Sequence, residues 1–244
     1  MTTSSVVLVT GAARRIGAEI VRALHAQGWN VLIHAHRSLA EAEALAAELN
    51  RARGDSAQAL QADLLDSAAL PALAAAAQAR WGRLDALVNN ASTYYPTPLG
   101  QVTPQAFEDL VGSNLRAPLL LTQACVARME QGAVVNLIDV NARRPQRGYS
   151  TYTAAKAGLW ALTEALALEL APRIRVNGVA PGHMIWPGAG QLDAAQQASE
   201  LARIPLGRVG GGAEIAHAVA YLLSPQAAYI TGAILPVDGG IRLA

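Results

Sequence analysis

The sequence predicts an α/β fold in which a doubly wound parallel sheet of about seven strands is covered by helices on both faces. Short β-branched runs alternate along the chain with longer segments rich in Ala, Leu and Glu, a pattern typical of parallel strands joined by crossover helices. With 244 residues, 52% of them hydrophobic, the chain can bury a large core. No internal repeat or low-complexity linker interrupts the pattern, so one domain over residues 1–244 is expected.

Each expected strand is a short apolar run with turn-forming or polar residues at its ends. Strands buried on both faces appear as nearly continuous hydrophobic runs, because neither face meets water. The expected strands are Val6–Thr10, Asn30–His34, Ala57–Gln61, Ala86–Asn89, Ala133–Ile138, Arg175–Ala180 and Ala233–Val237.

Helices are expected between the strands. The clearest are Ile16–Gln27, Ala40–Arg53, Ser67–Trp81, Thr103–Met129, Thr151–Leu170 and Ala213–Leu223. The least regular segment is Gly182–Ala202, which contains Pro187, Gly188 and Gly190 and is interpreted as a mobile loop or lid over the substrate. It follows a strand, and ligands of open α/β sheets bind beyond the carboxyl ends of strands.

Composition favours a small-molecule partner in the cytoplasm. A formal charge of +1 and a pI near 8.0 give no strong attraction to nucleic acid or to an anionic membrane. The single cysteine, Cys125, excludes an internal disulfide, and Met1–Val9 lacks the basic and apolar regions of a secretory signal. No apolar stretch approaches the roughly 20 residues that span a bilayer. No metal-ligand cluster is expected.

The turn after the first strand predicts a dinucleotide site. Thr10–Gly17 follows a strand and opens a helix, so its glycines allow a tight turn and close approach of a pyrophosphate to the helix N-terminus. The alternative is a simple turn. A cofactor with a free ribose 2′-OH expects a carboxylate about 20 residues later, but the chain has His36-Arg37-Ser38 there. Arg37 and Ser38 suit a 2′-phosphate, which predicts NADPH over NADH; alternatively, Arg37 is solvated and Ser38 is a helix N-cap.

The lysine content singles out one position. Of 19 basic residues 18 are arginine, and Lys156 is the only lysine. A GC-rich genome could cause the arginine excess, but the one lysine that persists then indicates a site that requires a compact ammonium, which a guanidinium does not replace.

Tyr152 and Lys156 are spaced i, i+4 on an expected helix and therefore project from one face. An adjacent ammonium favours the phenolate, so Lys156 is expected to lower the pKa of Tyr152. Lowering it by about three units requires roughly 4 kcal/mol, which a close cation and an oxidised nicotinamide could supply. Such a pair can also occur by chance. With Asp139 it forms a candidate catalytic group.

These motifs together resemble the short-chain dehydrogenase/reductase family in order and spacing across nearly the whole chain. The resemblance implies a Rossmann-type fold in which Tyr152 donates a proton, Lys156 holds the nicotinamide ribose and tunes Tyr152, and Asn114 supports a proton-relay water. The motifs that carry it are Thr10–Gly17, Asn89-Asn90-Ala91, Asn114, Tyr152-xxx-Lys156, Asn177 and Pro181-Gly182.

The resemblance also implies a set of cofactor contacts. Asp63 matches the adenine contact, and Asn90-Ala91 matches the stretch under the adenosine. The residues expected to bind NADPH are Gly11, Arg15, Ile16, Gly17, His36, Arg37, Ser38, Asp63, Leu64, Asn90, Ala91, Ser92, Tyr152, Lys156, Pro181 and Gly182.

Two departures from the general family pattern resemble pteridine reductases. Arg15 stands where most members have a glycine, and Asp139 stands where most have a serine 13 residues before the tyrosine. His36–Ser38 and the run Asn89–Leu99 share this resemblance. A carboxylate can accept the hydrogen bonds that an aminopyrimidine donates, whereas a serine suits a ketone oxygen. The alternative for Asp139 is a cap of the next turn.

The same resemblance implies a pterin site. Ser92 is expected to bind pterin or cofactor, Tyr94 to stack on the pterin, and Arg15 to meet pyrophosphate and substrate. Tyr94 and Tyr95 could instead be ordinary loop packing, and Trp186 could close the pterin slot or simply pack. The expected substrate contacts are Arg15, Ser92, Tyr94, Asp139, Tyr152, Met184 and Trp186.

The predicted activity is hydride transfer from NADPH to a C=N bond of a dihydropterin or dihydrofolate, with an oxidised pterin as a further candidate substrate. Tyr152 protonates the neighbouring nitrogen directly or through water near Asp139 and Arg15. A β-ketoacyl-(acyl-carrier-protein) reductase or a sugar dehydrogenase is the alternative within the family. A catalytically idle NADPH-binding regulator is the alternative of another class, against which intact Tyr152, Lys156 and Asn114 argue. The physiological pterin stays open, and the resemblance suggests a homotetramer.

Overall fold

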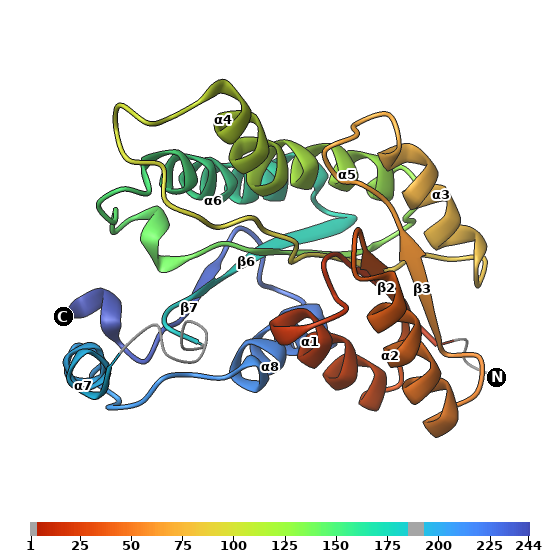
Figure 1. Cartoon of the computed structure of the whole chain (residues 1–244). Helices are drawn as coiled ribbons and strands as arrows, with labels where there is room; N and C mark the ends of the chain where they lie inside the picture. Colours follow the sequence, from red (N-terminus) through yellow and green to blue (C-terminus); the bar gives the residue numbers. More distant parts are fainter. Residues whose placement is uncertain (1–3, 185–192) are drawn as a thin grey trace.

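The computed structural model of the chain describes residues 4–184 and 193–244. Seven parallel strands form one sheet in the order β3-β2-β1-β4-β5-β6-β7 (Figure 1), which confirms the expected fold class. The order reverses between β1 and β4, and such a reversal places a crevice at the carboxyl ends of the strands. The strands are β1 Val6–Val9, β2 Asn30–Ala35, β3 Ala57–Gln61, β4 Ala86–Asn89, β5 Gly132–Leu137, β6 Ile174–Pro181 and β7 Ile234–Val237.

Helices cover both faces of the sheet. Helices α1, α2 and α8 lie on one face, and α3, α4, α5 and α6 lie on the other (Figure 1). Their bounds are α1 Arg15–Ala26, α2 Leu39–Ala52, α3 Leu70–Ala79, α4 Pro104–Val111, α5 Ala117–Val126, α6 Ser150–Leu170, α7 Ala194–Ala202 and α8 Gly212–Leu223. Among the described residues, no helix combines the length and the apolar character that a bilayer span requires.

The strands contribute to two separate cores because their side chains alternate between faces. Val7 and Val9 of β1 pack in the core beneath α1 and α8, while Val6 and Leu8 pack in the core beneath α3 and α5. All four side chains are fully buried. This two-sided burial is the reason for the continuous apolar runs in the sequence.

The prediction of a single α-helix over Thr103–Met129 is wrong in the middle of that range, where the structure has a π-helical turn between two α-helices. Thr103 caps α4 by accepting a hydrogen bond from the backbone N–H of Ala106 at 3.1 Å, as an N-terminal residue should. The turn Gly112–Arg116 is then π-helical before α5 begins. A Cβ on Gly112 would lie 2.7 Å from Leu65 Cδ2, so glycine permits close approach at this turn. Single π-helical turns frequently mark functional sites.

The loop predicted over Gly182–Ala202 is wrong at its end, because Ala194–Ala202 forms helix α7. Asp193 and Gln196 form a capping box: the Asp193 carboxylate accepts from the Gln196 N–H at 2.8 Å, and the Gln196 side chain accepts from the Asp193 N–H at 2.9 Å. This spacing is a recognised helix-start signal that the glycines and proline before it obscured. Residues 185–192 lie outside the described residues.

Candidate active site

The parallel sheet brings the candidate residues to one edge. They follow the carboxyl ends of six strands, and in a parallel sheet those ends lie together. The first such residues after β1 to β6 are Thr10-Gly11, His36, Ala62-Asp63, Asn90, Ile138-Asp139 and Gly182.

The turn after β1 has no room for side chains at its two glycines. Gly11 has a φ of +60°, and a Cβ on it would lie 2.9 Å from the Cα of Ala91. A Cβ on Gly17 would lie 2.5 Å from the carbonyl oxygen of Gly11. Asn90 holds the turn by donating from its amide to the carbonyls of Thr10 at 2.8 Å and Gly11 at 3.0 Å. This cradle at the N-terminus of α1 fits a pyrophosphate.

Arg15, the departure in this turn, also has a left-handed backbone, with a φ of +52°. That conformation favours glycine, and a non-glycine residue keeps it only where surrounding structure enforces it, often at functional sites. Arg14 pairs with Glu41 at 2.5 Å, whereas the exposed Arg15 has no carboxylate partner within residues 4–184 and 193–244. Arg15 is therefore free to meet an anion at the turn. Ile16 beside it is half-buried.

The residues expected at the cofactor 2′-phosphate lie after β2. Arg37 is exposed, and Ser38 occupies the N-cap position of α2 without accepting a hydrogen bond from the helix. The alternative in which the Ser38 hydroxyl caps the helix is therefore not what the structure has. His36 Nε2 lies 3.8 Å from Asp63 Oδ2, and Asp63 Oδ1 accepts from the Leu65 N–H at 2.9 Å. Leu64 beside Asp63 is half-buried.

His34 in β2 was not predicted as a site residue. Its Nδ1 accepts from the Gly11 N–H at 3.2 Å, so its Nε2 carries the proton and donates to the carbonyl of Ala62 at 3.1 Å. Burial lowers its pKa to about 4, which keeps the ring neutral. This side chain thus ties the glycine turn to the residue before Asp63. The only sequence signal was a histidine inside an otherwise apolar strand.

The three expected catalytic side chains meet at the end of β5. The Tyr152 hydroxyl donates to Asp139 Oδ2 at 2.7 Å, and Asp139 Oδ1 accepts from the Asn141 N–H at 2.7 Å. Asp139 therefore caps the 3-10 turn Val140–Ala142 and also binds Tyr152. Lys156 donates from Nζ to the carbonyl of Leu137 at 2.8 Å, and its Nζ lies 5.8 Å from the centroid of the Tyr152 ring.

Burial dominates the protonation of this group. It raises the pKa of Tyr152, and the charge and hydrogen bond of Asp139 raise it further. It also raises the pKa of Asp139 and lowers the pKa of Lys156 to about 8. The direction for Tyr152 is opposite to the expected lowering by Lys156, because a buried phenol beside a carboxylate keeps its proton. Tyr152 is accordingly held as a neutral proton donor.

Asn114 lies in the π-helical turn and is fully buried. Its amide donates to the carbonyls of Thr93 at 2.9 Å and Leu110 at 3.0 Å, and its Oδ1 accepts from the Ser92 hydroxyl at 2.7 Å. Asn114 therefore anchors the segment that carries Ser92 and Tyr94, and it has no hydrogen bond to Tyr152 or Lys156 among the described residues.

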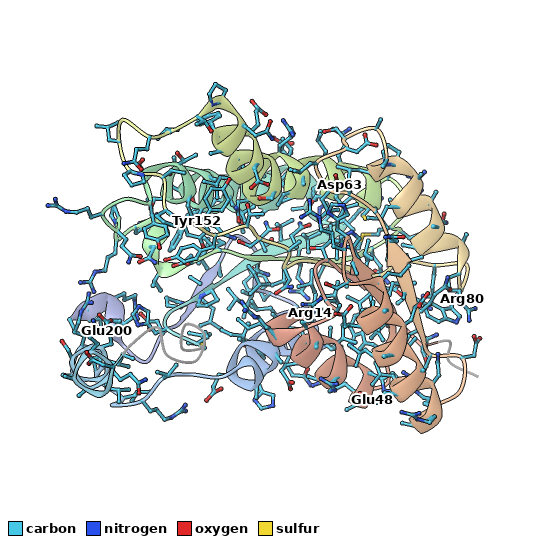
Figure 2. The ribbon with its side chains drawn as sticks, in the orientation of Figure 1. Arg14, Glu48, Asp63, Arg80, Tyr152 and Glu200 are labelled. Carbon is cyan, nitrogen blue, oxygen red and sulfur yellow. The ribbon has the colours of Figure 1, made fainter. Side chains whose placement is uncertain are left out.

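A cavity of about 840 Å³ opens beside the Asp139–Tyr152 pair. Figure 2 places its two labelled wall residues, Tyr152 and Glu200, on different elements, α6 and α7. Tyr94, Gly182 and Met184 also line the cavity. Pro181, the last residue of β6, directly precedes Gly182. Arg15 and Ser92 are not among the lining residues, and Trp186 lies outside the described residues.

Tyr94 and Tyr95 have different roles. Tyr94 stacks on Tyr149 with centroids 4.7 Å apart and meets Tyr152 edge-on at 4.8 Å, while its side chain is 51% exposed. One face of the Tyr94 ring is thus covered by Tyr149. The expected stacking of a pterin on Tyr94 would use the part of the ring that Tyr149 leaves open. Tyr95 instead donates to Asp109 Oδ2 at 2.8 Å and so packs against α4.

The cavity also has lining residues that were not predicted. Arg143, Arg144 and Arg203 line it together with His183 and Glu200. In an arginine-rich chain, no local sequence signal distinguishes these arginines from surface ones.

Comparison with known proteins places the chain among oxidoreductases. A family model described as "Enoyl-(Acyl carrier protein) reductase" matches residues 11–242. Pteridine reductase 1 of Leishmania tarentolae is 40% identical, over 99% of this chain and 97% of that protein. The 3-oxoacyl-(acyl-carrier-protein) reductase FabG of Staphylococcus aureus is 36% identical over 97% of both chains, and that of Escherichia coli is 35% identical over 98% of this chain and 97% of its own.

Proposed function

Because the chain belongs to the short-chain dehydrogenase/reductase family, a family of oxidoreductases, we propose that it is an NADPH-dependent pteridine reductase. It reduces a C=N bond of a dihydropterin or dihydrofolate. Oxidised pterins are a further possible substrate of the same site.

One observation carries this proposal. Asp139, which replaces the serine expected in ketone-reducing members, accepts a hydrogen bond from Tyr152 at 2.7 Å on the wall of the cavity. A carboxyl group there accepts hydrogen bonds from the amino and ring N–H groups of a pterin, whereas the hydroxyl of a serine is suited to donate to a ketone oxygen. The 40% identity to a protein named pteridine reductase supports the same reading.

The residues around the cofactor turn fit a phosphorylated dinucleotide. Gly11 and Gly17 leave no room for side chains, and the residues after β2 include no carboxylate at the ribose position. Arg37 and Ser38 would bind the 2′-phosphate, and the ammonium of Lys156, which has three protons and donates one of them to the carbonyl of Leu137, would bind the ribose. When bound, the nicotinamide supplies the hydride.

The remaining chemistry belongs to the protein. Tyr152 donates its proton to the ring nitrogen as the adjacent carbon gains the hydride, so the C=N bond becomes CH–NH. The resulting phenolate is stabilised by the Lys156 ammonium and regains a proton from water in the cavity. Asp139 holds the substrate and orients the Tyr152 hydroxyl.

The test is NADPH oxidation by the full chain with dihydrofolate, dihydrobiopterin and an acetoacetyl thioester in parallel. Pterin-dependent oxidation that exceeds thioester-dependent oxidation supports the proposal. Thioester-dependent oxidation that exceeds pterin-dependent oxidation favours the second candidate function, a 3-oxoacyl-(acyl-carrier-protein) reductase. The 36% identity to such an enzyme supports this candidate. Binding of NADPH without turnover of any substrate favours an idle regulator.

We also propose one catalytic domain over residues 1–244, a cytoplasmic location and a homotetramer. Light scattering of the purified chain tests the tetramer.

A further inference from the structure

Two guanidiniums on the cavity wall have no carboxylate partner in the part of the chain that the structure describes. Arg143 and Arg144 follow the 3-10 turn that Asp139 caps, and both line the cavity that contains Asp139 and Tyr152. Within residues 4–184 and 193–244 neither forms an ion pair. Two adjacent arginines without acidic partners, beside a proposed substrate, are candidates for binding an anionic part of that substrate.

Both guanidiniums are nevertheless held in place. The Arg143 guanidinium lies 4.2 Å from the centroid of the Trp160 ring, and Trp160 is fixed by donating from its indole N–H to Glu164 Oε1 at 2.9 Å. Arg144 donates from Nη1 to the carbonyl of Ile241. A side chain that is already ordered loses less conformational entropy when it binds a ligand, and a cation held over an aromatic ring keeps its charge and its free N–H groups.

The other charges on the wall are already engaged. Glu200 Oε1 lies 3.1 Å from Arg203, and its Oε2 lies 3.5 Å from His183. Both oxygens of Asp139 accept hydrogen bonds, from Tyr152 and from the Asn141 N–H. Among the described residues of this wall, Arg143 and Arg144 are therefore the arginines without a carboxylate partner.

The cavity has room for more than a two-ring heterocycle. Its volume of about 840 Å³ lies toward the upper end of the roughly 300–1,000 Å³ that ligand pockets occupy. Arg143 and Arg144 line the same cavity as Asp139 and Tyr94, so a substrate that extends beyond the two rings has guanidiniums of that cavity to bind.

We propose that Arg143 and Arg144 bind the carboxylates of a substrate tail, so that the preferred substrate is a dihydropterin carrying an acidic tail, as in dihydrofolate. A dihydropterin with a short, neutral hydroxylated tail is then the poorer substrate. The inference rests on the proposed pteridine reductase activity. The planar fork of a guanidinium matches a carboxylate, and two forks match a tail that ends in two carboxylates.

The experiment uses steady-state NADPH oxidation by the full chain with dihydrofolate and dihydrobiopterin. The variants are Arg143→Gln and Arg144→Gln, and the matched control is Arg147→Gln, an exposed arginine of the same segment that does not line the cavity. Each test variant is expected to raise KM for dihydrofolate roughly tenfold, the size of a lost charged hydrogen bond, and to leave kcat and the KM for dihydrobiopterin unchanged. Added salt is expected to raise the dihydrofolate KM of the native chain and of Arg147→Gln more than that of the test variants.

Four results would overturn the inference. In the first, the test variants change both pterins equally; in the second, Arg147→Gln acts as strongly as they do; in the third, the native chain reduces dihydrobiopterin at least as efficiently as dihydrofolate. Loss of acetoacetyl thioester reduction in the test variants, with dihydrofolate unaffected, would also overturn it, because the arginines would then bind a phosphate-bearing acyl carrier. A native chain that reduces neither pterin refutes the proposed function itself, and the two failures are therefore distinguishable.

Discussion

Tyr152 donates its hydroxyl proton to Asp139 across 2.7 Å, joining helix α6 to the end of strand β5. Both groups are shifted toward their protonated forms, since burial raises the pKa of each and Asp139 raises the pKa of Tyr152 further. The pair holds a transferable proton beside the cavity, which is what reduction of a C=N bond needs.

Asp139→Asn is expected to lower the pKa of Tyr152, because the negative charge that disfavours the phenolate is removed. Burial, the larger cause, stays, so the pKa stays above that of a free phenol. An ultraviolet difference titration between each protein and its Tyr152→Phe partner isolates this phenol from the other tyrosines. If the Tyr152 phenol titrates identically in the native chain and in Asp139→Asn, Asp139 does not control the protonation of Tyr152.

Arg37 is expected to set the cofactor preference. The native chain should prefer NADPH over NADH by well over tenfold, because charged hydrogen bonds to the 2′-phosphate contribute about 1.5–3 kcal/mol each. Arg37→Asp should invert the preference. Arg51→Asp, an exposed arginine at the other end of α2, is the control and should change nothing. If NADH already matches NADPH in the native chain, the assignment of Arg37 and Ser38 is refuted.

Turnover is expected to require both the charge and the compact shape of the Lys156 ammonium. Lys156→Arg should lose most of the turnover, because a buried site that fits an ammonium does not fit a guanidinium. The pKa of Lys156, about 8, adds a pH dependence: below pH 8 the ammonium can donate to the ribose, and above it the neutral amine binds less well. Affinity for NADPH, measured by fluorescence, should therefore fall as pH rises through 8. Near-native turnover of the arginine variant would contradict this account.

His34 is expected to position the cofactor turn without touching the substrate. His34→Leu removes the hydrogen bonds to Gly11 and Ala62, and it should raise the Kd for NADPH roughly tenfold with kcat at saturation retained. The control is His25→Leu. His25 is also buried and is bonded to Ser56 at 2.7 Å, but it lies at the amino ends of the strands. Both variants should lower Tm, and only the first should weaken NADPH binding; equal effects on binding would make His34 merely structural.

The same histidine makes stability sensitive to acid. The unfolded chain takes up this proton near pH 6.5 and the folded chain near its lowered pKa of about 4. Between these values the unfolded state binds more protons, so the free energy of unfolding falls as pH falls, by at most about 3 kcal/mol. Urea unfolding at pH 7, 6 and 5 should show a shallower decline in His34→Leu. Parallel declines in both proteins would contradict the neutral state of His34.

The central strands were predictable because strands such as β1 and β4 are buried on both faces, whereas the edge strands β3 and β7 are only partly buried. The expected strands Ala57–Gln61 and Ala86–Asn89 coincide with β3 and β4, and the other strands differ by only one or two residues at their ends. Helix α7 and the π-helical turn were missed for different reasons. The first begins at a two-residue capping box. The second contains Gly112, whose close approach to Leu65 is a contact between distant residues that no local pattern reveals.

At the site, local motifs predicted the residues that meet but not their electrostatics. The spacing of Tyr152 and Lys156 correctly placed both on one helix, yet the pKa of Tyr152 moves upward because Asp139, 13 residues earlier, is its hydrogen-bond partner. Arg143, Arg144 and His34 went unnoticed, because their significance comes from neighbours that are distant in sequence: Trp160, Ile241 and Gly11.

The most direct test of pteridine reduction is the Asp139→Ser variant, which restores the residue of ketone-reducing members and removes a charged acceptor. We expect kcat/KM for dihydrofolate or dihydrobiopterin to fall roughly 10- to 150-fold, since losing a hydrogen bond to a charged group costs about 1.5–3 kcal/mol. Fluorescence titration should show nearly unchanged NADPH binding, because the expected cofactor contacts lie elsewhere. If the serine variant reduces pterins as well as the native chain does, Asp139 only caps its turn and the proposed function loses its main support.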